Sequence, residues 1–153
     1  MEKETLKNIM HFLEKEDNKS SVKWKLLNKE PFTEEDLDVR GDLNLGQTII
    51  TSLPKGLKVG GYLSLVFTKI TSLPEGLVVG KNLDLYGSKI ESLPKGLEVG
   101  WHLDLAHSNI KLLPKGLKVG GALYIYKSPL KEYTDDELRE MIYPGFIKGK
   151  IYR

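Results

Sequence analysis

The sequence predicts a repeat β-solenoid of about five parallel coils, closed by a helical cap at the N-terminus and by a helix and strand at the C-terminus. The first observation is a 20-residue unit that recurs without a gap through the middle of the chain. Its four clear copies are residues 52–71, 72–91, 92–111 and 112–131. The second is that two aliphatic residues in each unit flank one variable residue, which is the period of a strand with one buried face. Such short strands bury their faces only when copies stack, and the tandem order therefore indicates a solenoid.

Residues 1–31 precede the repeat and are predicted to form an N-terminal helical cap. Residues 3–16 hold an apolar face at helical spacing, and further apolar residues that could cover the first coil follow. The helical face consists of Leu6, Ile9, Met10 and Leu13, and the residues that follow are Trp24, Leu26 and Leu27. Because an open solenoid end exposes apolar side chains and unpaired strand edges, a cap is the expected role of this segment.

The solenoid is expected to span residues 32–131, because a fifth and degenerate unit precedes the clear copies. Residues 32–51 keep the aliphatic positions in register but lack the Leu-Pro pair of the clear copies. These positions are Leu37, Val39, Leu43, Leu45 and Ile50. Since parallel strands lie roughly 4.8 Å apart, five stacked coils give a body on the order of 25 Å long.

Equivalent positions of the units are predicted to form columns along the solenoid. Leu63 and Leu65 belong to two buried columns, and Pro54 and Gly56 mark a turn that interrupts the extended chain. Gly60 and its copies indicate either a positive φ or a close backbone contact. A hydroxyl column consists of Thr48, Thr68, Ser88, Ser108 and Ser128. Hydroxyl groups at that position can bond to buried backbone groups, so we interpret this column as structural.

Residues 132–153 are predicted to form the C-terminal cap. Thr134 and Glu137, three residues later, form a capping-box pattern that marks the beginning of a helix. The apolar residues of this helix are Leu138, Met141 and Ile142. The final segment, GFIKGKIYR, then reads as a short terminal strand or tail.

The repeated unit resembles a short leucine-rich repeat. Its consensus, x-L-P-x-G-L-x-V-G-x-x-L-x-L-x-x-T/S-x-I-x, is similar to the 20-residue form of bacterial secreted effectors, L-P-x-x-L-x-x-L-x-x-L-x-L-x-x-N-x-L. This chain has glycine at the third leucine of that pattern and Thr or Ser at its asparagine. The resemblance covers residues 32–131 and implies a leucine-rich-repeat-like β-solenoid. Some such effectors carry a ubiquitin-ligase domain with a catalytic cysteine, but this chain has no cysteine, so that activity is not carried over.

The composition narrows the chemical possibilities. The absence of cysteine excludes disulfides, thiolate metal sites and cysteine nucleophiles. The charged N-terminus is unlike a signal peptide, and no apolar run approaches the roughly 18 residues of a membrane span. We therefore expect a soluble, cytoplasmic protein without a membrane segment. The sequence implies no cofactor, and it does not distinguish a monomer from a homodimer.

Variable positions beside the buried leucines form the predicted partner-binding face. Aromatic side chains are concentrated there, and exposed aromatic groups are enriched in interfaces because they bury a large area at low entropic cost. The predicted binding residues are Tyr62, Phe67, Asp84, Tyr86, Trp101, His102, Asp104, His107, Tyr124 and Tyr126. The expected anchors are Trp101, Tyr86, Tyr62 and Phe67, and the residues expected to set polar specificity are Asp84, Asp104 and His102. Aromatic residues also suit strands, or could lie under the terminal cap, which leaves a purely structural origin as an alternative.

The segment WHLDLAH, residues 101–107, carries an enzymatic hypothesis. His102 and Asp104 share a strand face, and Asp84 would lie one coil away. Two histidines and two carboxylates can ligate a metal, and a His–Asp pair can act as a general base, so a metal-dependent hydrolase is one alternative function. No activated serine and no phosphate-binding glycine loop accompany these residues. We therefore interpret Asp84 and Asp104 as an acidic spot for a partner's Lys or Arg.

Lysine columns support another alternative, a nucleotide- or nucleic-acid-binding protein. Residues 52–131 hold 11 Lys, no Arg and 5 acidic residues, whereas residues 32–51 have a net charge of −4. One column contains Lys55, Lys95 and Lys115, and another contains Lys58 and Lys118. The aromatic positions are expected on a different face, and a solvated edge explains the lysines more simply. Nucleic acid is therefore not the favoured partner.

The sequence thus predicts a non-catalytic protein-protein interaction module, with no catalytic, cofactor-binding or metal-binding residue assigned. A rigid aromatic face would block or scaffold a protein partner that the sequence does not identify. The tandem copies also resemble small repeat proteins of bacteria and their phages. That resemblance implies an inhibitor of a host or defence protein as one biological role.

Overall fold

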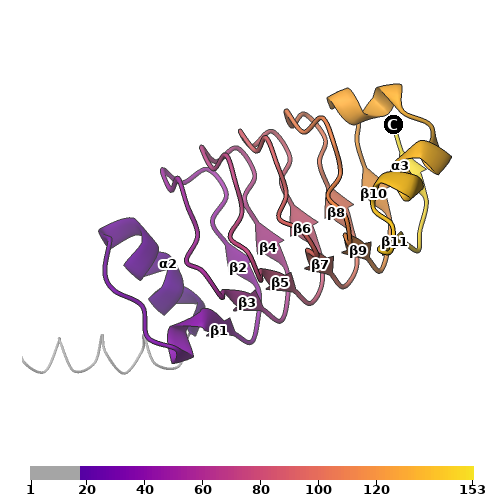
Figure 1. The fold of residues 1–153 in the computed structure, drawn as a ribbon. Coiled ribbons are helices and arrows are strands. Elements are labelled where there is room, and N and C mark those ends of the chain that lie inside the picture. The colour runs from indigo at the N-terminus through magenta and orange to yellow at the C-terminus, as the bar shows by residue number, and fades with distance from the viewer. Residues whose placement is uncertain (1–17) are drawn as a thin grey trace, which may run out of the picture.

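The structure, a computed structural model, describes residues 18–153, with side chains from residue 22 onward. These residues form a parallel β-solenoid whose coils stack between a helix at each end (Figure 1). The predicted fold class is therefore confirmed. The amphipathic face predicted within residues 3–16 lies outside the described residues.

Each coil contributes two strands of two residues, and these strands stack into two parallel six-stranded sheets. Sheet A consists of β1 (Asp38–Val39), β3 (Lys58–Val59), β5 (Val78–Val79), β7 (Glu98–Val99), β9 (Lys118–Val119) and β11 (Phe146–Ile147). Sheet B consists of β2 (Leu43–Asn44), β4 (Leu63–Ser64), β6 (Leu83–Asp84), β8 (Leu103–Asp104), β10 (Leu123–Tyr124) and β12 (Ile151–Tyr152). Through the first five coils, each residue pairs with the residue 20 positions along, so that Asp84 lies opposite Asp104.

The core is formed by the aliphatic columns that the repeat predicts. Leu63, Leu65 and Ile70 are completely buried, and so are the equivalent residues of the next three coils. One continuous cluster of buried side chains extends from Val22 near the N-terminus to Ile151 in the last strand. Because burying one such side chain contributes roughly 1.5–3 kcal/mol, the stacking of coils is the main stabilising interaction.

Two glycine columns shape the bends of each coil. Gly56 and its copies have φ between 67° and 81°, a left-handed conformation that glycine adopts without strain. The column of Gly60 serves close packing instead. A Cβ added at Gly100 would lie 2.0 Å from the backbone oxygen of Gly80 in the preceding coil. Close backbone contact, one of the two predicted explanations, is therefore the reason for this second column.

The hydroxyl column supports the backbone in three of its five coils. Thr48, Thr68 and Ser128 donate hydroxyl hydrogen bonds to the carbonyl three residues earlier, at oxygen–oxygen distances of 2.6, 2.8 and 2.9 Å. Ser88 and Ser108 are also buried, but their hydroxyl groups have no hydrogen-bond partner. Because an unsatisfied buried hydroxyl costs about 1–3 kcal/mol, equivalent positions in this column contribute differently to the free energy of folding.

Helix α2 (Asn18–Asn28) closes the N-terminal end. Val22 is completely buried and Leu26 packs against the core, whereas Trp24 and Leu27 remain exposed. Of the three residues predicted to cover the first coil, therefore, only Leu26 packs against it. The short helix η1 (Glu35–Leu37) follows and connects α2 to β1.

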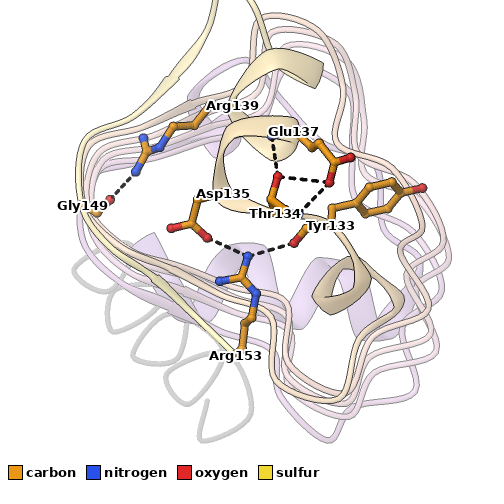
Figure 2. A network of polar contacts seen from close by, with 7 residues as sticks. All are labelled: Tyr133, Thr134, Asp135, Glu137, Arg139, Gly149 and Arg153. Carbon is orange, nitrogen blue, oxygen red and sulfur yellow. Dashed lines mark hydrogen bonds and ion pairs between the residues drawn. The ribbon is translucent and has the colours of Figure 1, made fainter.

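The C-terminal cap contains η2 (Pro129–Glu132) and α3 (Asp135–Met141). The predicted capping box is present, because the Thr134 side chain accepts the Glu137 N–H and the Glu137 side chain accepts the Thr134 N–H (Figure 2). Leu138 and Ile142 are completely buried, so α3 is anchored on the core. The prediction of a C-terminal helix is confirmed.

The final segment adds a sixth coil rather than a loose tail. Strand β11 pairs with β9 and strand β12 pairs with β10, so the segment supplies one strand to each sheet. Phe146 lies opposite Lys118, 28 residues earlier, whereas Lys118 lies opposite Glu98, 20 residues earlier. The longer offset accommodates η2 and α3, and α3 lies at the C-terminal end of the stack without disturbing the register of the strands (Figure 1).

Candidate functional site

The ten predicted binding residues lie on sheet B and its flanking bends, where they form two clusters and one separate residue. The aromatic row contains Phe67, Tyr86, His107 and Tyr126. The carboxylate groove contains Tyr62, Asp84, His102, Asp104 and Tyr124. Trp101 takes part in neither cluster. It is 56% exposed, and its ring lies 5.8 Å from Lys81 Nζ.

The aromatic row crosses four successive coils. The ring centroids of Phe67 and Tyr86 are 5.4 Å apart, those of Tyr86 and His107 are 4.9 Å apart, and those of His107 and Tyr126 are 5.6 Å apart. The first and last pairs meet edge to face, an arrangement that aromatic quadrupoles favour. Phe67 and Tyr126, at the two ends, are 55% and 51% exposed. The row is therefore ordered by ring contacts while its ends remain open to solvent.

Backbone conformation places two members of this row. Phe67 and His107 have φ of 54° and 55°, and Gly87, at the equivalent position between them, has φ of 62°. For a residue with a side chain, the left-handed region costs roughly 1–2 kcal/mol. A Cβ added at Gly87 would lie 2.4 Å from a ring carbon of Phe67, so this glycine leaves the space that the ring occupies. The sequence therefore stabilises the position of Phe67 by omitting a side chain in the next coil.

The carboxylate groove is a shallow hollow of about 210 Å³ beside the row. Asp84 and Asp104 lie opposite each other in neighbouring strands of sheet B. Each carboxylate accepts an N–H from the residue two positions later, Tyr86 at 3.0 Å and Ala106 at 2.8 Å. These bonds hold both side chains at the surface of the sheet, with Tyr62 and Tyr124 lining the same groove.

The electrostatics of the groove favour a positive ligand. Burial raises the pKa of Asp104, and the negative charge of Asp84 raises it further, although the Ala106 N–H and His107 act in the opposite direction. Two carboxylates in register repel each other, and a cation between them reduces that repulsion. The groove can therefore receive an ammonium or guanidinium group.

His102 connects coils through its ring nitrogen. Its Nδ1 accepts the backbone N–H of Ala122 in the next coil at 2.8 Å. The backbone N–H of His102 donates to Asn82 Oδ1 in the preceding coil at 3.1 Å. The ring also meets Tyr124 edge to face at 6.0 Å. Within residues 18–153, no group of three or more His, Asp or Glu side chains is placed to hold a metal ion. The hydrogen bonds of His102 therefore connect its coil to both neighbouring coils.

Two residues of this face were missed by sequence reasoning. Tyr152 in the sixth coil stacks on Tyr124 with centroids 4.9 Å apart and an interplanar angle of 11°. Asn82 lines the groove and bonds to the next coil. The sequence does contain an indication of Tyr152. Aligning residues 145–153, GFIKGKIYR, with residues 117–125, LKVGGALYI, places Tyr152 opposite Tyr124.

The hollow beside α2 and the lysine columns are two further surfaces that could bind a ligand. A larger hollow of about 410 Å³ lies between α2 and the first coil, where Leu27 and Ile49 are among the apolar residues that line it. In one lysine column, Lys118 Nζ pairs with Glu98 Oε1 at 2.6 Å, so that column is not uniformly basic. No helix within the described part of the chain is long and apolar enough to span a membrane.

The fold and this face together define a repeat β-solenoid of stacked 20-residue coils with an aromatic and acidic surface on one sheet. Comparisons of the chain with protein families, with curated proteins and with solved structures found no match. The function is therefore inferred from the geometry of the face alone.

Proposed function

We propose that this solenoid is a non-catalytic protein-binding module whose binding face is the aromatic row together with the carboxylate groove. One observation carries the proposal. Four rings from four successive coils contact one another, while the rings at both ends of the row stay more than half exposed. Such a preorganised apolar surface gains free energy when a partner covers it, because little conformational entropy is lost on binding.

The carboxylate groove would provide polar specificity. A Lys or Arg of the partner placed between Asp84 and Asp104 forms charge-assisted hydrogen bonds, and the neighbouring rings of Tyr62 and Tyr124 add cation–π attraction. The apolar row would therefore supply affinity and the groove would select a basic residue. Binding of this kind acts by occlusion, which suits an inhibitor that covers a functional surface of its partner.

The test begins with retention of a protein from bacterial lysate on the immobilised chain, followed by calorimetric titration of the purified retained protein. Tyr86→Ala is expected to weaken binding by about 30-fold, or about 2 kcal/mol, because Tyr86 contacts both Phe67 and His107. Circular dichroism should show that the variant keeps its fold. Unchanged affinity in both Tyr86→Ala and Phe67→Ala would rule out the aromatic row.

Tyr143→Ala is the matched control. Tyr143 is 77% exposed in the C-terminal cap and lies outside both clusters, so its removal should leave affinity unchanged. Trp101→Ala then measures how far the face extends, since a loss equal to that of Tyr86→Ala would place the bend before sheet B inside the interface. Retention of nucleic acid that is lost when Lys55, Lys95 and Lys115 are neutralised would contradict the proposal.

A further inference from the structure

The carbonyl groups at the end of each coil normally receive the next coil. In sheet A, Val99 O accepts the Gly120 N–H at 2.9 Å, and the adjacent bend carbonyl, Trp101 O, accepts the Gly121 N–H at 2.7 Å. The same pair of contacts recurs one coil later, where Val119 O and Gly121 O accept the N–H groups of Lys148 and Gly149 at 3.0 and 2.9 Å. These two carbonyls, together with a third such as Leu117 O, which accepts the Phe146 N–H at 2.9 Å, are the acceptors that a coil offers to the next coil along sheet A.

In the sixth coil two of these acceptors are occupied by a side chain. Ile147 lies opposite Val119, so Ile147 O and Gly149 O are two of the carbonyls on which a seventh coil would form. Arg139 donates to both of them, from Nη1 to Ile147 O and from Nη2 to Gly149 O. The bond to Gly149 O is 3.0 Å long (Figure 2). The guanidinium group presents parallel N–H donors in a fixed plane, and it replaces the two backbone N–H groups of a further coil.

The position of Arg139 is fixed by its surroundings. It lies in the last turn of α3, beside Leu138, which is completely buried. The other arginine of the cap, Arg153, binds Tyr133 O and Asp135 instead, and neither partner is a strand carbonyl that a new coil would use. Arg139 forms no ion pair with the described residues, so its donors are directed to the strand edge.

The opposite end of the molecule carries the complementary groups. Arg40 and Gly41 are the first-coil equivalents of Gly60 and Gly61, whose N–H groups donate to the preceding coil at Val39 O and Gly41 O. The first-coil N–H groups of a second copy would therefore match the carbonyls that Arg139 occupies. Contact between two such different ends does not close on itself, so it would produce an open, growing assembly.

We propose that Arg139 terminates the solenoid by taking the place of a seventh coil, and that it thereby prevents a second copy of this chain from adding end to end. Helix α2 lies against β1 and β2 at the other end, which provides the second barrier. Lys25 holds this helix through Asp36, with Nζ and Oδ2 2.5 Å apart. Assembly should therefore increase most when both barriers are weakened.

The experiment compares self-association by sedimentation velocity over a wide range of protein concentration. Arg139→Ala is expected to associate weakly, and Arg139→Ala combined with Lys25→Met is expected to associate strongly. Lys25→Met alone and Arg153→Ala are the controls, and both should sediment as the wild type does, because Arg139 still occupies the carbonyls. A folded double variant that sediments as the wild type does would overturn the proposal, as would equal association of Lys25→Met and the double variant.

A second substitution covers the case in which Arg139→Ala unfolds the cap. Arg139→Lys keeps the charge but presents one compact ammonium group, which cannot fill two separated carbonyls in the same fork geometry. Combined with Lys25→Met, it should still associate more strongly than Lys25→Met alone. Equal sedimentation of these two folded proteins would show that Arg139 is a local stabilising contact and not the stop.

Discussion

The two ends of the solenoid use the same local motif for different purposes. At the N-terminal end, the Thr33 N–H and hydroxyl donate to Asp36 Oδ2 at 2.6 and 2.8 Å, and the Asp36 N–H donates to the Thr33 hydroxyl at 3.4 Å. At the C-terminal end, Thr134 and Glu137 make the same three contacts at 2.7, 3.1 and 3.2 Å. Each motif pairs a threonine with an acid three residues later.

The difference between the two motifs is burial. Asp36 is 7% exposed and also accepts Lys25 from α2, whereas Glu137 is exposed and its contacts stay within the first turn of α3. Burial alone would raise the pKa of Asp36, but the hydrogen bonds from Lys25 and Thr33 together lower it to about 2. A Thr–acid motif thus becomes a tertiary link when its carboxylate is buried and receives a donor from another element.

The largest expected effect comes from removing each carboxylate in turn. Asp36→Ala should destabilise the protein by about 2–3 kcal/mol, because it leaves the partly buried Lys25 ammonium and the Thr33 N–H without their acceptor. Glu137→Ala should cost about 0.5–1 kcal/mol, as expected for an exposed cap. Urea unfolding followed by circular dichroism measures both. Equal losses would mean that burial does not distinguish the two motifs.

Acid should weaken the N-terminal end selectively. Since the pKa of Asp36 is lowered from 3.8 to about 2, its stabilising contribution is complete above about pH 4 and is lost as the pH falls to about 2. The corresponding loss is about 2 kcal/mol. Trp24 lies within α2, so its fluorescence in a Trp101→Phe background reports on this end. Asp36→Asn in the same background should remove the acid-dependent change, and a persistent change would assign it to another carboxyl group.

The smallest expected effect is the loss of stability when one hydroxyl hydrogen bond is removed from the coils between the two ends. Ser128→Ala should cost about 1 kcal/mol, because it removes the bond from the buried Ser128 hydroxyl to Ile125 O. Ser108→Ala, at the equivalent position, should be neutral or slightly stabilising, because the Ser108 hydroxyl has no partner. Thermal unfolding of the two variants compares them directly. A larger loss for Ser108→Ala would contradict the assignment of that hydroxyl as unsatisfied.

Most of the fold could be predicted because the same pattern of buried residues recurs in every repeat. The spacing of Leu63 and Leu65, copied every 20 residues, fixes both the strand period and the stacking register. For the sixth coil the sequence predicts only a strand or tail. Its residues lie 28 positions after their partners, not 20, and its glycine and aliphatic pattern is degenerate. The cover over the first coil is smaller than predicted, since the apolar character of Trp24 and Leu27 does not determine whether these side chains face the core.

The site was less predictable, because side-chain contacts depend on the bends between strands. The outward positions of sheet B follow from alternation, yet the row also depends on the left-handed backbone of Phe67 and His107, which composition does not reveal. Trp101 and Tyr86 are both predicted anchors, but the structure places Trp101 beside Lys81 and apart from the aromatic row. His102 similarly reads as a chemical group, while its Nδ1 is used by the Ala122 N–H.

The sixth coil has a consequence for how this architecture can be modified. It accepts a longer connection between the hydroxyl column and sheet A, yet both of its strands keep their register. The connection at this corner can therefore differ in length while the strands on either side keep their pairing. Copying one whole unit should lengthen the aromatic and acidic surface in increments of about 4.8 Å, so that this chain can serve as a molecular ruler of adjustable length.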